Sequence, residues 1–119
     1  MTMRFLPAIL ALSAVLALEA APALAVTEGL SGRQLVLDSR KGNCAACHSM
    51  PTVSEAGATG NTGAPLVAMS ARFPDKAALR NLIWDASVQN PRSFMPPFGR
   101  HRILTEAEID RVVDYIYGL

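Results

Sequence analysis

Two thiols and one imidazole lie within five consecutive positions of this chain, in the segment Cys44-Ala45-Ala46-Cys47-His48. At this spacing two cysteines can add across the vinyl groups of one haem while the adjacent histidine reaches its iron. The chain has two cysteines in all, so none is left for a disulfide framework or a second metal cluster. The segment therefore predicts one covalently attached haem c, with Cys44 and Cys47 in the thioether bonds and His48 as an axial ligand.

Three other uses of these residues fit the rest of the chain less well. A zinc site needs four ligands, and the other histidine, His101, stands alone in the sequence. A thioredoxin-like redox pair needs alternating strands and helices around it, whereas the flanking residues have a helical period. A plain disulfide between the two cysteines is the third alternative. Haem attachment is favoured over all three because the chain also begins with an export signal.

That signal occupies the first 25 residues. Arg4 supplies a positive charge, Phe5–Leu18 is an apolar stretch, and Ala23-Leu24-Ala25 offers a small-residue cleavage site. The apolar stretch is shorter than the roughly 20 residues that a membrane-spanning helix needs. We therefore expect cleavage after Ala25, export to the periplasm, no stable membrane anchor, and one mature domain over 26–119. An uncleaved anchor is the alternative.

The composition of the mature part is that of a small soluble domain. Removal of the signal leaves 94 of the 119 residues, a size at which a fold usually needs a covalent or metal staple, and haem would supply it. Without Arg4 and Glu19 the chain has ten basic and nine acidic side chains, so nothing indicates a nucleic-acid partner.

Helical periodicity predicts an all-α protein. Together with the haem motif, it leads us to expect a small class I cytochrome c-like fold wrapped around one covalent haem. The first helix is expected over 32–41, with Ser31 as its cap. A second is expected from Pro74 onward. The last is the clearest, because Thr105 and Glu108 form a capping box before apolar residues that recur at helical spacing up to the C-terminus.

The residue on the far side of the iron decides whether the protein carries electrons or binds small molecules. Met95 is the expected ligand, since it lies in the stretch Asn-Pro-Arg-Ser-Phe-Met-Pro-Pro-Phe-Gly, whose prolines stiffen the loop. Met50 is too close to His48 in sequence to reach the far side. Met69 is expected to fill space between helices, and His101, in a polar stretch, is expected to be solvated. Histidine and methionine together close both axial positions, which predicts one-electron transfer.

Four segments of the chain resemble SoxX, the monohaem c-type subunit of the SoxAX complexes of bacterial thiosulfate oxidation. They are Gly42–His48, Gly60–Leu66, Asn90–Thr105 and the terminal helix around Glu108–Tyr115, and together they span nearly the whole mature chain. The haem motif is common to c-type cytochromes. The specific part is therefore the block from Asn-Pro to Met-Pro-Pro-Phe-Gly, joined to the capped last helix.

The resemblance implies a periplasmic heterodimer with SoxA, a dihaem or monohaem catalytic subunit whose haem is ligated by a cysteine persulfide. There thiosulfate is joined oxidatively to a cysteine of the carrier protein SoxY. By this resemblance the chain accepts the released electrons, passes them to a small cytochrome and makes no bonds itself. Cys44 and Cys47 match the family's thioether positions, and His48 and Met95 match its axial ligands.

One position departs from a common cytochrome pattern. Many c-type cytochromes place proline directly after the loop glycine, where its carbonyl accepts the Nδ1 proton of the proximal histidine. Here Ala64 holds that place and Pro65 follows. Every residue has a backbone carbonyl, so the sequence leaves open which one orients His48.

Two other functional classes remain open from the sequence. A freestanding electron shuttle would show a charged docking face, whereas a permanent subunit would show an apolar patch beside the haem edge. The apolar side chains of Phe94–Phe98 favour the subunit, unless they are buried against the haem. A sensor with an open iron would need Met95 to be displaceable.

Three further side chains have two possible roles each. Arg100 and Arg102 either pair with haem propionates or an acidic partner, or are solvated. Trp84 either donates to a propionate or packs in the core, which is the expected role.

Overall fold

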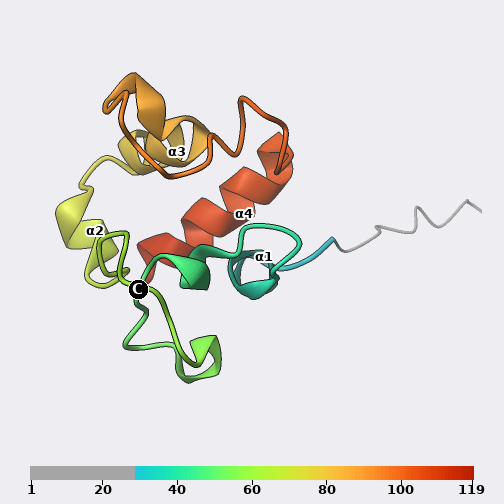
Figure 1. The fold of residues 1–119 in the computed structure, drawn as a ribbon, viewed down its shortest axis with the longest axis vertical. Coiled ribbons are helices and arrows are strands. Elements are labelled where there is room, and N and C mark those ends of the chain that lie inside the picture. The colour runs from blue at the N-terminus through green and yellow to red at the C-terminus, as the bar shows by residue number, and fades with distance from the viewer. Residues whose placement is uncertain (1–28) are drawn as a thin grey trace, which may run out of the picture.

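The computed structural model describes residues 29–119, so the export signal and the cleavage after Ala25 lie outside the described residues. This part of the chain has seven helical elements and no strand, which confirms the all-α class (Figure 1). The α-helices are α1 (Gly32–Leu37), α2 (Met69–Arg72), α3 (Lys76–Trp84) and α4 (Glu106–Tyr117), and single 3₁₀ turns lie at Cys44–Ala46, Ser54–Ala56 and Ala86–Val88. Within the same residues no helix has the length and apolar character that crossing a bilayer requires.

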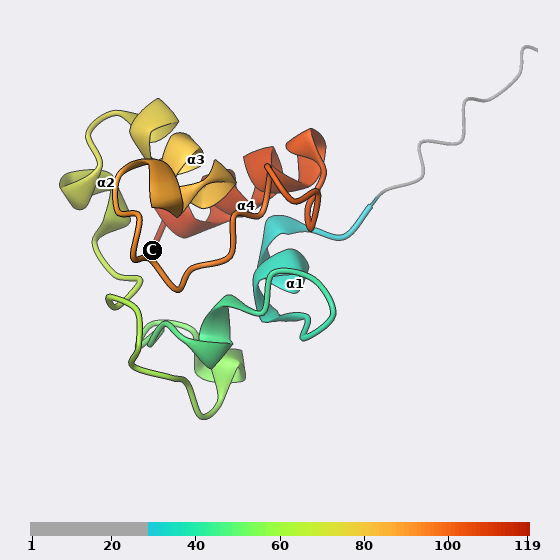
Figure 2. The same ribbon diagram turned by 45° about the horizontal axis from the view of Figure 1, so that its top comes forward.

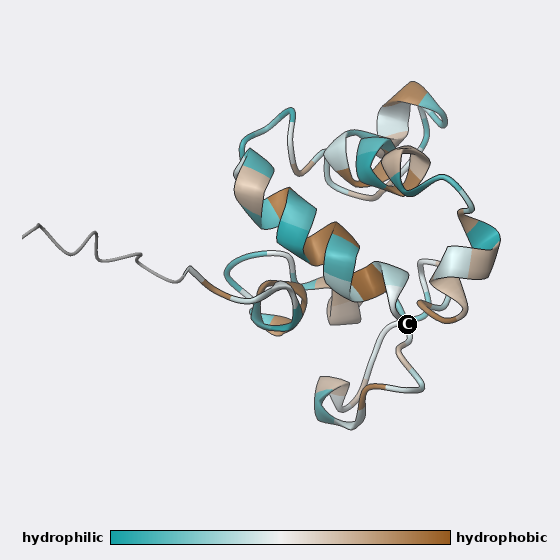
Figure 3. Ribbon diagram, turned by 180° about the vertical axis from the view of Figure 1, so that it is seen from behind, coloured by the Kyte–Doolittle hydropathy of each residue, from teal (hydrophilic) through white to brown (hydrophobic). Residues whose placement is uncertain are grey.

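α4 is the central element of the fold and begins as the sequence predicts. Thr105 Oγ1 accepts a hydrogen bond from the Glu108 N–H at 3.2 Å, and Glu108 Oε2 accepts one from the Thr105 N–H at 2.9 Å. The helix has one apolar side, visible as brown bands in Figure 3, and that side is buried in the core: Ile109, Val112, Val113 and Ile116. The capping box stabilises the start of a helix whose buried side packs against two others.

α4 lies against α1 on one side and α3 on the other, as Figures 1 and 2 show. At the contact with α1 there is no room for a side chain on Gly32, because a Cβ atom there would lie 2.8 Å from Tyr115 Cβ. The sequence therefore lets the two helix backbones approach closely at this point. Leu35 and Val36 of α1 are fully buried beside them.

α1 is shorter than the sequence predicts, since it ends at Leu37 and not near Lys41. Its start is as expected, with a cap on Ser31. Its end is set by Asp38, which has an extended backbone and whose Oδ1 accepts a hydrogen bond from the Arg40 N–H at 2.8 Å. An aspartate that bonds to the backbone two residues on favours a turn over further helix, and this turn leads the chain toward the cysteines.

α3 begins at Lys76, two residues after the proline at which the sequence places its start. Asp75 caps it by accepting a hydrogen bond from the Ala77 N–H at 2.9 Å. Leu79 and Ile83 are its buried residues. The short helix α2, which precedes it, was not predicted, because four residues are too few to show a helical period.

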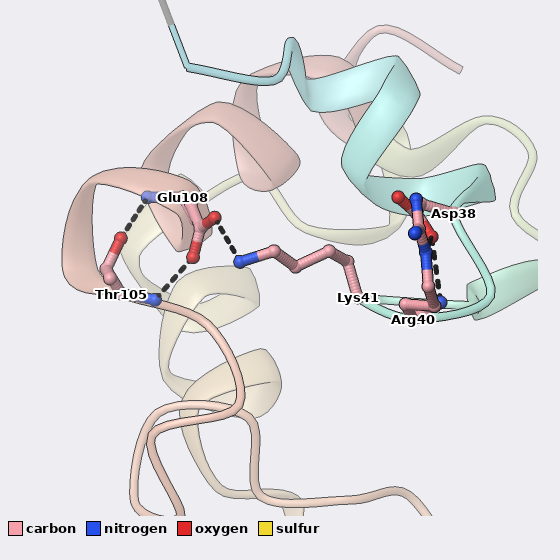
Figure 4. Close-up of polar contacts among 5 residues, drawn as sticks. All are labelled: Asp38, Arg40, Lys41, Thr105 and Glu108. Carbon is pink, nitrogen blue, oxygen red and sulfur yellow. Dashed lines mark hydrogen bonds and ion pairs between the residues drawn. The ribbon is translucent and has the colours of Figure 1, made fainter.

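An ion pair joins the start of α4 to the loop before the first cysteine. Lys41 Nζ lies 2.8 Å from Glu108 Oε1, while the other oxygen of the same carboxylate serves the capping box (Figure 4). The hydrogen bonds from Lys41 and from the Thr105 N–H lower the pKa of Glu108. One largely buried carboxylate thus holds together two segments that are 67 residues apart.

Replacement of Glu108 separates its two roles. In the haem-loaded protein, E108Q keeps an acceptor for the cap but loses the charge that pairs with Lys41, and we expect it to lower the free energy of unfolding by about 0.5–1 kcal/mol at pH 7. E108A loses both interactions and should lower it by about 1–2 kcal/mol. Urea unfolding measures both changes.

The same variants should show an acid dependence. Because the pKa of Glu108 is lowered in the folded protein, its contribution is present above the ordinary carboxyl pKa of 4.5 and is lost as the pH falls below it. The difference in unfolding free energy between wild type and E108Q should therefore fall to zero between about pH 5 and pH 3. A gap that persists at low pH would contradict the ion pair, and D114N, which removes an exposed partner of Lys76, is the control.

Candidate haem-binding site

A cavity of about 820 Å³ lies between the haem motif, α3, α4 and the loop that follows α3. Cys44, Cys47, His48 and Met95, the four residues that the sequence singles out, all line it. Its walls are largely apolar side chains from α3 and α4: Leu79, Leu82, Ile83, Val112 and Ile116. The volume is in the range of about 300–1,000 Å³ that is typical of sites for small molecules and cofactors.

A backbone carbonyl orients the imidazole of His48. Its Nδ1 lies 2.6 Å from the carbonyl oxygen of Ala64. A carbonyl can only accept, so the proton is on Nδ1 and the lone pair of Nε2 is free to bind a metal. The sequence leaves open which backbone carbonyl orients His48. The structure shows that it is the carbonyl of Ala64, the residue before Pro65.

The loop that supplies this carbonyl is fastened to the haem motif along its length. Three backbone hydrogen bonds join the two segments: Gly60 N–Ala45 O at 2.9 Å, Gly63 N–Cys47 O at 2.8 Å and Leu66 N–Ser49 O at 2.8 Å. A further hydrogen bond ties the same loop to α2, because the Arg72 guanidinium donates to the Pro65 carbonyl at 2.6 Å. Hydrogen bonds therefore fix the backbone on both sides of Ala64, and with it the position of the carbonyl that accepts from His48.

Gly63 allows the loop to approach the imidazole closely. A Cβ atom at this position would lie 2.6 Å from Nδ1 and 2.7 Å from Nε2 of His48. Such distances are well inside van der Waals contact, so any side chain here would force the ring to tilt. Glycine at 63 is thus a requirement of the histidine's position.

The two cysteines are free thiols at the edge of the cavity. Cys44 begins the 3₁₀ turn of Cys44–Ala46 and Cys47 follows it, and the N–H groups of Cys47 and His48 both donate to the Cys44 carbonyl, at 3.1 and 2.9 Å. Burial raises the pKa of the Cys44 thiol to about 11, so this thiol is neutral at physiological pH, whereas Cys47 is exposed. The turn thus places Cys44, Cys47 and His48 on the lining of one cavity.

Of the four candidates for the second axial position, two line the cavity. Met50 is buried elsewhere in the core, and His101 is exposed outside it. Met69 lines the cavity but is 3 % exposed, and its sulfur accepts a hydrogen bond from Arg72 at 3.3 Å. Met95 lines it from a loop and has no such bond among the described residues, which leaves its sulfur available.

The three side chains with two possible roles do not reach the cavity. Arg100 Nε donates to Asp85 at 2.5 Å, which is a structural ion pair that neither sequence alternative foresaw. Trp84 packs against the hydrophobic core, as expected, and Arg102 is exposed.

Asp85 is the residue that sequence analysis missed. Its side chain is 7 % exposed and accepts hydrogen bonds from the Ser87 N–H and hydroxyl, at 3.0 and 2.5 Å, and from Arg100. The Ser87 and Arg100 hydrogen bonds lower its pKa, so it is ionised at neutral pH. The spacing of Asp85 and Ser87 is a signal for a short cap, but nothing in the sequence points to a partner 15 residues away.

The residues around the cavity fit a haem. The cavity has apolar walls for a macrocycle, two free thiols at its edge, an imidazole whose Nε2 is free, and a methionine sulfur that has no hydrogen bond within residues 29–119. These are the donors and surroundings that a c-type haem requires. Fold and site together define a c-type cytochrome.

Comparison with known proteins identifies the family. The model of the family described as cytochrome c oxidase, cbb3-type, subunit III matches residues 30–116, and the chain belongs to this family. Its haem cofactor and electron-transfer role follow from that membership. A search of curated proteins found no similar sequence.

Among solved structures, the chain is similar to one in the crystal structure of SoxXA from P. pantotrophus. The TM-score is 0.65 at 24 % sequence identity, with 72 % of this chain and 77 % of that chain covered. At this identity the similarity establishes the fold, which is the class I cytochrome c-like fold that the sequence predicts.

The close approach at Gly63 gives a test of the site. G63A places a methyl group against the His48 ring, and we expect the haem-loaded protein to lose about 1–3 kcal/mol of unfolding free energy, with a reduced yield of attached haem. G118A is the matched control, since a Cβ there has only an ordinary contact, 3.5 Å from the Tyr115 carbonyl oxygen. Equal melting temperatures and haem yields for the two variants would contradict the assigned packing.

Proposed function

We propose that this chain is a monohaem cytochrome in which Cys44 and Cys47 hold the haem by thioether bonds and His48 and Met95 are its axial ligands. The observation that carries the proposal is that all four residues, drawn from two distant segments, line a single apolar cavity. The free Nε2 of His48 supports the axial assignment, and so does the Met95 sulfur, which no donor in the described part of the chain contacts.

The bound haem supplies a one-electron redox centre, and the chain tunes and protects it. Ala64 keeps His48 in the tautomer that presents Nε2. The apolar side chains of α3 and α4 would keep water from one side of the bound haem, and a thioether ligand would favour the ferrous state more than a second imidazole. With both axial positions filled by the protein, the chain has no place for a substrate on the metal, and electron transfer is its expected activity.

Within this class we propose a SoxX-like role, as the exported subunit that accepts electrons from a SoxA-like partner during thiosulfate oxidation and passes them to a small cytochrome. The resemblance of four sequence segments and the similarity in fold to a chain of SoxXA support it. So does Phe94, which lines the cavity mouth and is 93 % exposed, whereas Phe98 is buried. An exposed aromatic side chain at the haem edge suits a lasting protein contact.

A freestanding electron shuttle is the second candidate, and the charges at the cavity favour it. Arg72 and Arg92 line the cavity and are exposed, Lys41 lines it but is paired with Glu108, and none of the described residues that line it is acidic. A basic rim promotes fast, salt-sensitive encounters with acidic partners, as a carrier needs. Salt dependence therefore discriminates between the two candidates.

Covalent attachment has a direct test. The double variant C44A/C47A should retain no haem after extraction with acidified organic solvent, whereas the wild-type chain should keep its haem on a denaturing gel and show the mass of one haem per chain. Single variants should keep the haem through one thioether bond. Haem that is extracted from the wild type would contradict the proposed attachment.

The subunit role is tested by co-expression with a SoxA-like chain. We expect a heterodimer that survives high salt, and haem reduction on addition of thiosulfate and the carrier protein. F94S should weaken the complex at least about tenfold, as loss of an interface anchor does. V88S is the matched control, because Val88 is 79 % exposed but does not line the cavity. A monomer whose haem thiosulfate does not reduce, but which exchanges electrons rapidly with other cytochromes, would contradict the subunit role and favour the freestanding shuttle.

A further inference from the structure

The loop that carries Met95 begins and ends on the same short segment at the end of α3. The Asn90 N–H donates to the Ala86 carbonyl at 3.0 Å, and the Gly99 N–H donates to the Trp84 carbonyl at 3.1 Å. In Figures 1 and 2 the orange segment after α3 loops out and returns beside that helix before α4 begins. The two contacts form a neck, defined here by residues 84–86, 90, 99 and 100.

An ion pair closes this neck. Asp85 lies between the two carbonyls, and its Oδ2 accepts a hydrogen bond from Arg100 Nε at 2.5 Å. Ser87 holds the other oxygen through its N–H and its hydroxyl. The carboxylate is buried, and its three hydrogen-bond donors come from both ends of the loop.

Inside the neck the loop has few constraints of its own. Its internal hydrogen bonds are short-range: Arg92 N–Asn90 Oδ1 at 3.1 Å, Ser93 N–Asn90 O at 2.9 Å and Met95 N–Ser93 Oγ at 3.2 Å. Phe94 is exposed and Met95 is only half-buried against the core, whereas Phe98, near the end of the loop, is buried. Packing therefore holds residues 91–95 less firmly than the two ends of the loop. The position of the Met95 sulfur therefore depends on how firmly the neck is closed.

We propose that Asp85 is a positioning residue for Met95: its ion pair with Arg100 closes the neck and keeps the methionine sulfur on the iron. Asp85 does not line the cavity, so it acts only through the loop. The inference rests on the proposed Met95 ligation. It assigns a role in tuning the haem to a residue that neither the haem motif nor the axial ligands include.

The test measures how readily an external ligand displaces Met95. In the ferric haem-loaded protein, imidazole competes with the methionine for the iron, so its apparent affinity rises with the fraction of molecules in which Met95 is detached. We expect D85N to bind imidazole about tenfold more tightly than wild type and to weaken the absorption band of the ferric iron–methionine bond. D110N, which removes an exposed partner of Arg80, should change neither.

A second background separates positioning from general loosening. M95A should bind imidazole tightly, and D85N added to M95A should change the affinity less than about twofold, because the ligand through which Asp85 acts is gone. An equal gain in both backgrounds, or no gain with D85N in the wild type, would overturn the proposal. If D85N fails to take up haem, R100Q, on the exposed side of the ion pair, is measured in the same way.

The failure of Met95 ligation itself would look different. In that case M95A would bind imidazole no better than wild type, and the proposed axial assignment would fall together with the role of Asp85. If M95A binds imidazole tightly but D85N and R100Q bind it with the affinity of the wild type, only the role of Asp85 is overturned.

Discussion

The hydrogen bond from His48 to the Ala64 carbonyl is the interaction on which the site depends. The haem motif fixes the thiols and the histidine backbone, but it leaves the imidazole free to rotate. A carbonyl at 2.6 Å removes that freedom and settles which nitrogen carries the proton. The loop 60–66, its bonds to the motif and the glycine at 63 all serve to put this one oxygen in place.

The sequence predicted the parts of this structure that local chemistry decides. The cap at Ser31, the capping box of Thr105, the apolar side of α4 and the four residues at the cavity all follow from short-range patterns. It failed where a local choice was ambiguous. α1 ends at Leu37 because Asp38 bonds to the backbone ahead of it, and a helical period alone cannot reveal that competition.

The remaining features are long-range pairings, and no pattern in one sequence specifies them. Lys41 with Glu108 and Asp85 with Arg100 join segments that meet only after the chain has folded. Arg100 shows the consequence. From the sequence it was a candidate for an ion pair with a haem propionate or an acidic partner, whereas in the structure it pairs with the buried carboxylate of Asp85. The preference for Met95 over Met69 came from the prolines around Met95, and the structure adds the hydrogen bond from Arg72 to the Met69 sulfur.

Fold and family agree on a c-type cytochrome, and they leave its partner to experiment. The family description names an oxidase subunit, while the similar structure is that of SoxXA. A common fold serves both, because one fold can carry different partner surfaces. In the proposed docking surface the exposed Phe94 and the basic side chains that line the cavity favour different modes of docking.

The most direct measurement is a nuclear magnetic resonance spectrum of the ferrous haem-loaded protein with isotope-labelled methionine methyl groups. A methyl group bound above the haem plane experiences the ring current of the macrocycle and is shifted far upfield. The account predicts one such resonance, from Met95, with Met50 and Met69 in the ordinary range. A spectrum without a shifted methyl group, or one in which the shifted group belongs to Met69, would contradict it.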